Sequence, residues 1–340
     1  MIISAPNDPP RAETLVALLQ ARACSTPDAK AYAFLADGEA PAGALTYGAL
    51  DRRARAVAAR LREAAEPGAR ALLLYDPGLE FLPAFFGCLY AGLVAVPLHA
   101  PHQNRNLERV LTVQQDADAA LGLIAAEKRD DVARWTETLP GLGALTWIAT
   151  DAPDEAADPL PASACAPAGD DLAFLQYTSG STSAPKGVMV GHGNLLHNLD
   201  EIHRCIHVTD DSIFVTWLPH FHDLGLIFGL LQPCFNGVPC HLMPPAAFLQ
   251  RPLRWLRAIS AYSATHSPAP NFAYDLCVDR IPSEKRQGLD LSRWKLAVNA
   301  AEPVRADTLR RFTEAYAPFG FRSQAWCPCF GLAEATLKVA

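Results

Sequence analysis

The 340-residue sequence contains no apolar run long enough to cross a membrane. Its longest apolar stretches, such as Leu224–Leu231, fall well short of the roughly 20 residues that a spanning helix needs. Residues 1–10 have neither a charged leading region nor an apolar segment, so no secretory signal is recognised. We therefore expect a protein without a membrane span, and a cytoplasmic location is the default expectation.

Positive charge is also scarce. The 29 Lys and Arg residues are outnumbered by 36 Asp and Glu, which gives a formal net charge of −7 and leaves no basic stripe. Neither nucleic acid nor an anionic membrane is suggested as a partner. Half of the residues are hydrophobic and 19% are charged, a composition typical of globular proteins with a large core.

Support for a disulfide framework or a transition-metal site is equally weak. The nine cysteines are odd in number and scattered through apolar segments, which favours reduced, buried thiols. Examples are Cys88, Cys205, Cys234 and Cys277. Cys327 and Cys329 lack the second Cys/His pair that a zinc site requires. Two histidine pairs have chelating geometry but no partnering cluster, namely His203/His207 and His220/His222.

What the sequence does contain is a regular alternation of helix and strand patterns. Thr46 is a favourable N-cap for a helix whose apolar positions recur three and four residues apart, at Leu50, Ala54, Val57 and Leu61. Short apolar runs typical of buried strands occupy residues 31–35, 71–75, 94–98, 119–124 and 144–149. This alternation predicts an α/β fold whose parallel sheet is covered on both faces.

The alternation continues in the second half of the sequence. Residues 151–169 are rich in Ala, Pro and Asp and form either a domain linker or a connecting loop. Asn194 is the expected N-cap of the next helix, and an apolar helix is expected to run to Leu231. Further strands are predicted at 213–218, 240–243 and 294–298, and further helices at 253–262 and 307–316.

A hydroxyl-rich and glycine-containing turn follows the apolar run 172–175. It consists of Thr178, Ser179, Gly180, Ser181, Thr182 and Ser183. Glycine allows close backbone approach, successive N–H groups form an anion-binding concavity, and Lys186 adds a positive charge suited to phosphate. A Walker A loop is excluded because Lys186 precedes Gly187 and Val188. By composition alone, the turn is either a polyphosphate site or an ordinary solvated hairpin.

Four polar segments follow apolar strands, at residues 178–186, 220–223, 299–303 and 330–334. In an open parallel sheet, ligands collect outside the carboxyl ends of the strands. These segments therefore predict one crevice for a nucleotide and a second substrate, although each segment taken alone is an ordinary loop.

The segment TSGSTSAPKG (178–187) closely resembles the phosphate loop of the AMP-forming adenylating enzymes. The resemblance extends over nearly the whole chain and narrows to the fatty acyl-AMP ligase branch. The segments that narrow it are WLPHFHDLGLIFGLLQPCFNGVP (217–239), residues 248–277, NAAEPVRADTLRRF (299–312) and FGLAEATL (330–337). It implies an AMP-binding large domain spanning 1–340, with stacked, mostly parallel sheets, covering helices and approximate subdomains 1–170 and 171–340.

The resemblance also implies roles for the nucleotide-binding residues. The loop from Thr178 to Ser183, with Lys186, would hold the β- and γ-phosphates of ATP. Backbone groups at residues 300–303 would form the adenine wall, Phe330 would stack on the adenine, and Gly331 would allow the nucleotide to approach. The residues of that wall are Ala300, Ala301, Glu302 and Pro303.

Three further residues are assigned to the reacting groups by the same resemblance. Glu334 would bind the Mg²⁺ that bridges the phosphates, a role suited to a hard oxygen ligand. His222 would lie where the acyl carboxylate meets the α-phosphate, and Gly225 would border the acyl tunnel. Lys186, His222 and Glu334 are thus the expected catalytic residues. The alternatives are a metal-free carboxylate at a helix N-terminus for Glu334 and a structural histidine for His222.

The implied activity is ATP-dependent conversion of a fatty acid to its acyl-adenylate, with pyrophosphate as the leaving group. The acyl group would pass to the phosphopantetheine thiol of an acyl carrier protein, feeding polyketide or lipopeptide synthesis. Transfer to CoA is the alternative, and a non-catalytic AMP-binding fragment is a further one. Family members continue beyond the point that corresponds to Ala340 into a small C-terminal domain, so the resemblance implies an incomplete large domain with low turnover.

Three positions depart from the family pattern. Ser183 and Ala300 stand where the family usually has glycine, and Phe330 stands where it usually has tyrosine. Ala300 adds a methyl group where the backbone is expected to approach adenine, and Phe330 keeps the ring but loses a hydroxyl. We therefore predict weakened ATP binding.

Overall fold

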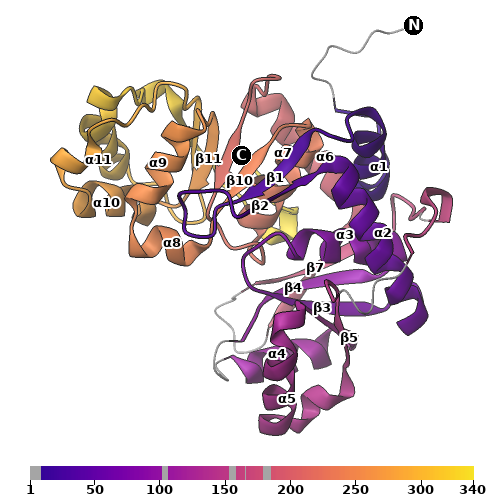
Figure 1. Cartoon of the computed structure of the whole chain (residues 1–340). Helices are drawn as coiled ribbons and strands as arrows, with labels where there is room; N and C mark the ends of the chain where they lie inside the picture. Colours follow the sequence, from indigo (N-terminus) through magenta and orange to yellow (C-terminus); the bar gives the residue numbers. More distant parts are fainter. Residues whose placement is uncertain (1–8, 102–105, 153–157, 165, 179–184) are drawn as a thin grey trace, which may run out of the picture. The chain divides into compact units, whose positions relative to one another are not determined.

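The computed structural model describes residues 9–101, 106–152, 158–164, 166–178 and 185–340, which form two compact α/β units (Figure 1). The N-terminal unit combines Pro10–Asp28 with Thr46–His197, and the C-terminal unit combines Ala29–Leu45 with Asn198–Ala340. The sequence suggested an approximate division at 170/171. In the structure the division falls inside helix α6 (His192–Ile206).

The N-terminal unit is built on a six-stranded sheet. Its strands, in spatial order, are β6 (Thr146–Ala149), β5 (Ala119–Ile124), β3 (Arg70–Tyr75), β4 (Val94–His99), β7 (Leu172–Thr178) and β8 (Lys186–Gly191). Neighbouring strands are parallel except for β7 and β8, which form an antiparallel pair. The mostly parallel sheet expected from the sequence is confirmed.

Helices cover both faces of this sheet. Helices α2 (Tyr47–Ala64) and α3 (Phe81–Ala91) lie on one face, and α4 (Leu107–Asp116) and α5 (Arg129–Thr138) lie on the other (Figure 1). Side chains alternate along β3: Leu72 and Leu74 join the core beneath α4 and α5, whereas Tyr75 meets Phe81 of α3. The predicted N-cap of α2 is confirmed, because the Thr46 hydroxyl accepts a 3.2 Å hydrogen bond from the Ala49 amide. Helix α1 (Leu15–Ser25) completes the unit.

The C-terminal unit contains a seven-stranded sheet. Its order is β13 (Trp326–Pro328), β12 (Leu296–Asn299), β11 (His266–Ala269), β9 (Phe214–Thr216), β10 (Cys240–Leu242), β1 (Lys30–Phe34) and β2 (Gly43–Thr46). Every neighbouring pair from β13 to β1 is parallel. The carboxyl ends of β9, β11, β12 and β13 therefore share one edge of the sheet.

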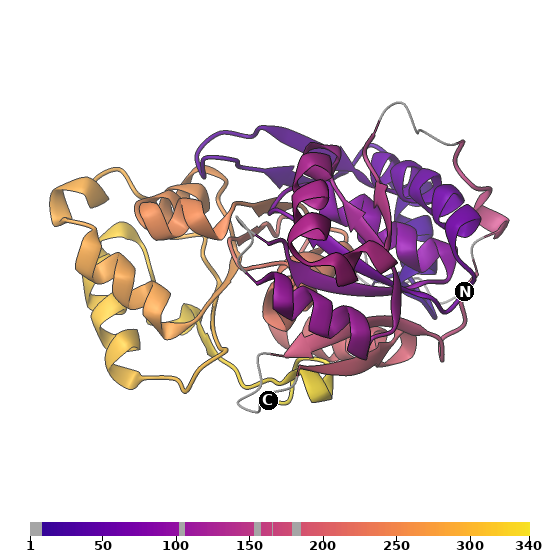
Figure 2. The same cartoon turned by 90° about the horizontal axis from the view of Figure 1, so that it is seen from below.

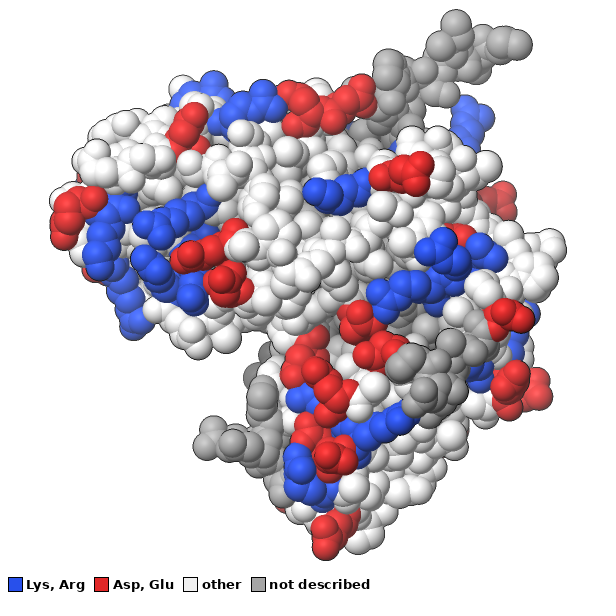
Figure 3. All heavy atoms as spheres, in the orientation of Figure 1, with Lys and Arg blue, Asp and Glu red and all other residues white. Residues whose placement is uncertain are grey.

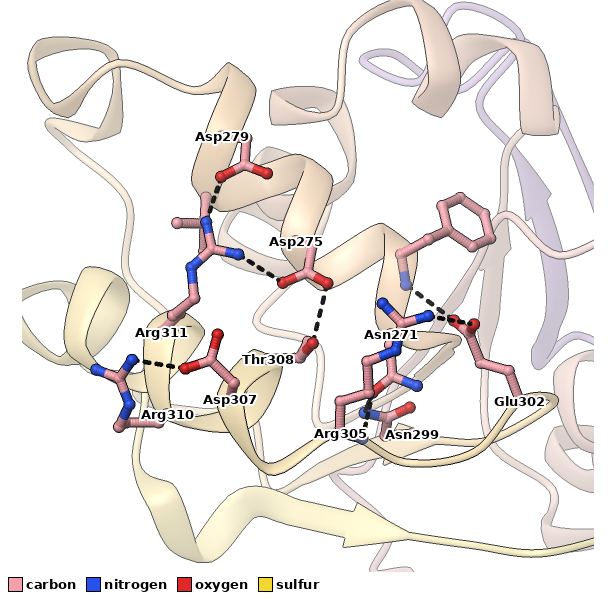
Figure 4. A network of polar contacts seen from close by, with 12 residues as sticks. Asn271, Asp275, Asp279, Asn299, Glu302, Arg305, Asp307, Thr308, Arg310 and Arg311 are labelled. Atoms are coloured by element: carbon pink, nitrogen blue, oxygen red, sulfur yellow. Dashed lines mark hydrogen bonds and ion pairs between the residues drawn. The ribbon is translucent and has the colours of Figure 1, made fainter.

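Four helices lie on one side of this sheet (Figures 1 and 2), where they pack around an aromatic core. They are α8 (Pro245–Gln250), α9 (Leu253–Ala261), α10 (Asn271–Arg280) and α11 (Ala306–Tyr316). The rings of Trp255, Tyr274 and Trp294 are fully buried and contact one another in this core. Helices α10 and α11 are joined through Asp275, which accepts hydrogen bonds from Thr308 and Arg311 (Figure 4).

The apolar segment Leu224–Leu231 packs on the strands as a π-helix and continues into α7 (Gln232–Asn236). Gly229 allows this close packing, because an added Cβ would lie 3.0 Å from the Thr216 hydroxyl. The sequence predicted a helix here, but its apolar pattern did not distinguish the wider π-turn. The π form occurs mainly in short stretches, often at functional sites.

One helix start was predicted wrongly. Helix α6 begins at His192, so Asn194 lies in its first turn instead of capping it. The Asn194 side chain reaches back and accepts a 3.2 Å hydrogen bond from the Gly191 amide. A residue in the first turn can satisfy the same exposed N–H groups as an N-cap residue. Helices α8 and α10 and strands β11 and β13 were not predicted.

None of the helices within the described ranges is long and apolar enough to span a bilayer. On the face drawn in Figure 3, basic and acidic side chains are interspersed, in agreement with the mixed charge of the sequence. Cys205, which the sequence grouped with buried thiols, is exposed, whereas Cys88, Cys234 and Cys277 are buried as expected.

Candidate functional site

A pocket that is partly open to solvent lies in the C-terminal unit beyond the ends of β12 and β13. The predicted adenine residues Ala300 and Ala301 line it after β12, and Phe330 and Gly331 line it after β13. The π-helix contributes Leu224 and Phe228, and α6 contributes Ile202 and Ile206. The pocket thus joins positions predicted for the nucleotide to a largely apolar wall.

The turn after β12 is anchored by Asn271, the first residue of α10 (Figure 4). The Asn271 side-chain oxygen accepts hydrogen bonds from the Asn299 amide group at 2.9 Å and from the Arg305 main-chain N–H at 3.0 Å. Its amide nitrogen donates to the Pro303 carbonyl oxygen at 2.8 Å. Both Asn271 and Asn299 are fully buried, so these bonds hold the turn at a defined position.

Ala301 has a φ of +70°, in the left-handed region that non-glycine residues rarely adopt. Such a conformation costs on the order of 1 kcal/mol and is common where a backbone must present its polar groups to a ligand. Ala300, where the family usually has glycine, is buried and is not among the residues with positive φ. The strain in this turn therefore falls on Ala301.

The Glu302 carboxylate faces α10. It accepts a 3.0 Å hydrogen bond from the Phe272 main-chain N–H and lies 3.8 Å from the Arg305 guanidinium (Figure 4). A carboxylate in this position satisfies an N–H group of the first helical turn. The side chain of Glu302 is thereby engaged with the helix, and its backbone is what remains to contact a ligand.

Phe330 and Gly331 begin a short antiparallel ribbon. The Phe330 amide donates to the Ala340 oxygen at 2.8 Å, and Gly331 pairs with Lys338. A Cβ on Gly331 would lie 2.2 Å from the Leu337 carbonyl oxygen, so the ribbon itself requires glycine here. The Phe330 ring is 61% exposed at the pocket, which leaves its face available for stacking.

His222 and Asp223 lie between β9 and the π-helix. The Nδ1 atom of His222 lies 2.7 Å from the Asp223 carboxylate, and the imidazole is about half exposed. Asp223 lines the pocket, whereas His222 and Gly225 are not among its lining residues. A Cβ on Gly225 would lie 2.0 Å from the Pro219 carbonyl oxygen, so packing against the β9 turn requires this glycine.

Glu334 lies in the short helical turn Ala333–Ala335 with its side chain exposed. An exposed carboxylate fits the preference of Mg²⁺ for one or two carboxylates combined with substrate phosphates. Across the described parts of the chain, no group of three or more His, Cys, Asp and Glu side chains is arranged to hold a metal on its own.

The remaining predicted residues belong to the N-terminal unit. Thr178 ends β7 and Lys186 begins β8, and the two residues are direct partners in the antiparallel pair. Lys186 is exposed and Thr178 is half-buried. The residues between them that were assigned to phosphate lie outside the described ranges: Ser179, Gly180, Ser181, Thr182 and Ser183.

Comparison with known proteins decides the family. Residues 19–340 match the family described as AMP-binding enzyme. The chain belongs to this family. Its relatives include the medium-chain-fatty-acid–acyl-carrier-protein ligase JamA of Moorena producens, 46% identical over 97% of this chain and 56% of JamA. The long-chain-fatty-acid–AMP ligase FadD32 of Mycolicibacterium smegmatis is 40% identical over 87% of this chain and 48% of FadD32.

Solved structures of related enzymes support the same family assignment. The fatty acid AMP ligase from Legionella pneumophila matches with a TM-score of 0.88 and 44% identity, over 97% of this chain and 56% of that chain. A second structure from this organism, also at 0.88 and 44%, contains acyl adenylate and pyrophosphate. The resemblance to the fatty acyl-AMP ligase branch is confirmed, and the chain spans about half the length of the relatives that it matches.

Several residues that line or hold this pocket were not predicted. Asn271 and Asn198 are buried side-chain amides that hold the turns on either side of the pocket. Asn198 accepts from the Lys338 amide at 3.0 Å and donates to the Lys338 oxygen at 3.1 Å. Phe228 is buried and also lines the pocket. Neither amide carries a local signal, because each acts on residues distant in sequence.

Proposed function

We propose that this chain activates a fatty acid as its acyl-adenylate, using ATP and Mg²⁺. The observation that supports this function best is the shared pocket of the C-terminal unit. It brings Ala300, Ala301 and Phe330, assigned to the nucleotide, together with the apolar residues Leu224 and Phe228. A site that serves both an adenine and a hydrocarbon chain needs this combination.

In the proposed reaction, a carboxylate oxygen of the fatty acid attacks the α-phosphorus of ATP. The bond from that phosphorus to the bridging oxygen breaks, and pyrophosphate leaves with the bonding electrons. The fatty acid is already ionised at neutral pH, so no protein base is needed. Catalysis then consists of positioning the two substrates and stabilising the charge on the phosphates.

Each predicted residue has a place in this scheme. Phe330 stacks on the adenine, and the backbone of the turn at 300–303 recognises its edge. His222 lies near the reacting carboxylate, beside Asp223 at the pocket. Gly225 keeps the π-helix close to the β9 turn and so shapes the acyl wall. Mg²⁺, when bound by Glu334 and the phosphates, supplies charge neutralisation.

We assign the triphosphate tail to the turn between β7 and β8. Thr178 and Lys186 face each other at its base, and Lys186 is exposed. The hydroxyls and amides of residues 179–183 are the proposed phosphate donors, as the motif indicates. This part of the proposal rests on the sequence motif together with the hairpin that frames it.

The acceptor of the acyl group is proposed to be the phosphopantetheine thiol of an acyl carrier protein, since JamA is named for that acceptor. The described cysteines are free, which favours a reducing compartment such as the cytoplasm. CoA as acceptor, and adenylate formation without any transfer, are distinct outcomes of the test below.

The test incubates the full chain with ATP, Mg²⁺ and fatty acids of several lengths and follows acyl-AMP by mass spectrometry and pyrophosphate release by a coupled assay. We expect both products with the unmodified chain and a loss of at least about tenfold in rate for Lys186→Ala. Lys285→Ala removes another exposed lysine and should leave the rate unchanged. Adding CoA or a phosphopantetheinylated carrier protein then identifies the acceptor.

Two results would contradict the proposal. One is the absence of both acyl-AMP and pyrophosphate although ATP binds, which would make the chain a nucleotide-binding module without this chemistry. The other is equal product formation by Lys186→Ala and Lys285→Ala, which would remove the β7–β8 turn from the reaction.

A further inference from the structure

Two cysteines in the pocket wall have no role in the proposed reaction. Cys327 lies in β13, Cys329 follows it directly, and both are half-buried and line the pocket. Their Sγ atoms lie 3.4 Å apart. Residues two apart in a strand project to the same side, which explains why both thiols reach the same pocket.

We propose that Cys327 and Cys329 form a thiol modification site, in which a hydroperoxide generates a disulfide between them and thereby closes the pocket to its nucleotide. The effect on the nucleotide rests on the function proposed above, whereas formation of the disulfide does not.

The pair is arranged for this chemistry. The Cys329 thiol can donate to the Cys327 sulfur, which lowers the pKa of Cys327 below that of an ordinary thiol against the opposing effect of burial. The same interaction raises the pKa of Cys329, and burial raises it further. The pair therefore contains one thiolate and one thiol over a wider pH range than two isolated cysteines, and the thiolate is the reactive form.

The reaction proceeds in two balanced steps. The Cys327 thiolate attacks one oxygen of the hydroperoxide, the O–O bond breaks, and the other oxygen leaves as hydroxide or alkoxide, producing a sulfenic acid. The Cys329 sulfur then attacks the sulfenic sulfur, an S–S bond forms, and the hydroxyl group leaves as water together with the Cys329 proton. Two thiols are oxidised and one peroxide is reduced.

Closure of the disulfide has to strain β13. Two strand rises place the Cα atoms of residues i and i+2 about 6.6 Å apart, at the upper end of the range that a disulfide accepts. The sulfurs must also approach from 3.4 Å to about 2.05 Å. Pro328 between them fixes its own φ, so the adjustment falls on its neighbours.

The strand neighbours connect this strain to the nucleotide wall. Cys327 pairs with Val298 and Pro328 pairs with Asn299 in the parallel ladder. The Cys329 amide donates to the Asn299 carbonyl oxygen at 3.0 Å, immediately before Ala300. Phe330 directly follows Cys329. A contraction between the two cysteines therefore displaces residues on both sides of the pocket.

The test treats the full, reduced chain with hydrogen peroxide, quenches it with an alkylating reagent and maps tryptic peptides without reduction. Peptide 323–338 contains both thiols, so the proposed disulfide makes it lighter by two hydrogens and unreactive to alkylation. We expect the rate of disulfide formation between Cys327 and Cys329 to be at least about tenfold higher than the rate of oxidation of Cys24, an exposed single thiol. Cys329→Ser should instead leave a sulfenic acid at Cys327 that a dimedone probe traps.

Binding of ATP is measured in parallel, before oxidation, after it and after dithiothreitol. We expect affinity to fall at least about tenfold on oxidation and to return on reduction, with Cys24→Ser behaving like the unmodified chain. If peptide 323–338 stays reduced while Cys24 oxidises, or if either thiol is linked to Cys205 of the same pocket, the modification site is refuted. If the disulfide forms but ATP binding is unchanged, closure of the pocket is refuted. A reduced chain that binds no ATP contradicts the proposed function, while the peptide map still decides the disulfide.

Discussion

The side-chain amide of Asn271 donates a 2.8 Å hydrogen bond to the main-chain oxygen of Pro303, and this contact ties the start of α10 to the turn that lines the pocket. The same side chain also receives hydrogen bonds from Asn299 and Arg305. The buried side chain of Asn271 therefore forms hydrogen bonds at both ends of the turn that contains the strained Ala301.

Asn271→Ala is expected to lower the free energy of unfolding by roughly 2 to 4 kcal/mol, because it leaves buried donors and an acceptor unpaired. ATP affinity should fall as well, since Ala301 is no longer held. Asn271→Asp keeps both accepted bonds but places an acceptor oxygen against the Pro303 carbonyl oxygen in a buried site, so it should destabilise at least as much as Asn271→Ala. Urea unfolding and nucleotide titration measure the two quantities, with exposed Gln287→Ala as the control.

Gly225→Ala is expected to destabilise the C-terminal unit by several kcal/mol, because the added methyl group would overlap the Pro219 backbone. Backbone atoms cannot move aside as a flexible side-chain end can. Gly143→Ala is the matched control, since a Cβ there meets nothing within 4 Å and should change stability by less than about 0.5 kcal/mol. Equal unfolding midpoints for the two variants would show that Gly225 is not a packing requirement.

Ala300→Gly and Phe330→Tyr are expected to tighten ATP binding by a few fold each. The first removes a buried methyl group from the pocket wall, and the second supplies a hydroxyl at an exposed ring that keeps its stacking face. Isothermal titration measures the affinity. Phe272→Tyr, at another exposed aromatic of the same unit, should have no effect. Unchanged affinity in both pocket variants would mean that these departures from the family pattern do not weaken ATP binding.

Acid should weaken the C-terminal unit through His266. This residue is fully buried, with Nε2 2.9 Å from the Ile206 carbonyl oxygen and Nδ1 2.7 Å from the Thr265 hydroxyl. A carbonyl only accepts, so Nε2 carries the proton and Nδ1 accepts from the hydroxyl. Desolvation lowers the pKa of His266 to about 4, below the value of about 6.5 in an unfolded chain.

Between these two pKa values the unfolded chain binds more protons, so stability is fully present above about pH 6.5 and declines as the pH falls toward 4. For a single such histidine, the free energy of unfolding should be roughly 2 kcal/mol lower at about pH 5 than at about pH 7. Burial also lowers the pKa of His192 and of His241 to about 4, so three residues contribute. Urea unfolding of the chain at both pH values should show the difference reduced by about a third in His266→Gln. An unchanged difference would assign the acid sensitivity to other groups.

The sequence determined those features that depend on neighbours along the chain. Thr46 caps α2 as predicted because its hydroxyl bonds to an amide three residues away. Strand β5 occupies Ala119–Ile124 as predicted, because a short run of apolar residues is typical of a buried strand. The proposed site residues, from the 178–186 turn to Phe330, likewise come from motifs of contiguous residues and stay a prediction.

The tertiary structure decided what those residues do with their side chains. The motifs did not show that the Glu302 carboxylate caps α10. They did not show that the carbonyl groups of Pro219 and Leu337 leave room only for glycine at 225 and 331. Nor did they show that Cys327 and Cys329 line the same pocket as Phe330. The roles of Asn198 and Asn271 were hidden for the same reason. A local sequence pattern reflects which residues of a helix or strand are buried and how its backbone hydrogen bonds form. The contacts of a side chain depend instead on which distant segment of the chain the fold packs against that helix or strand.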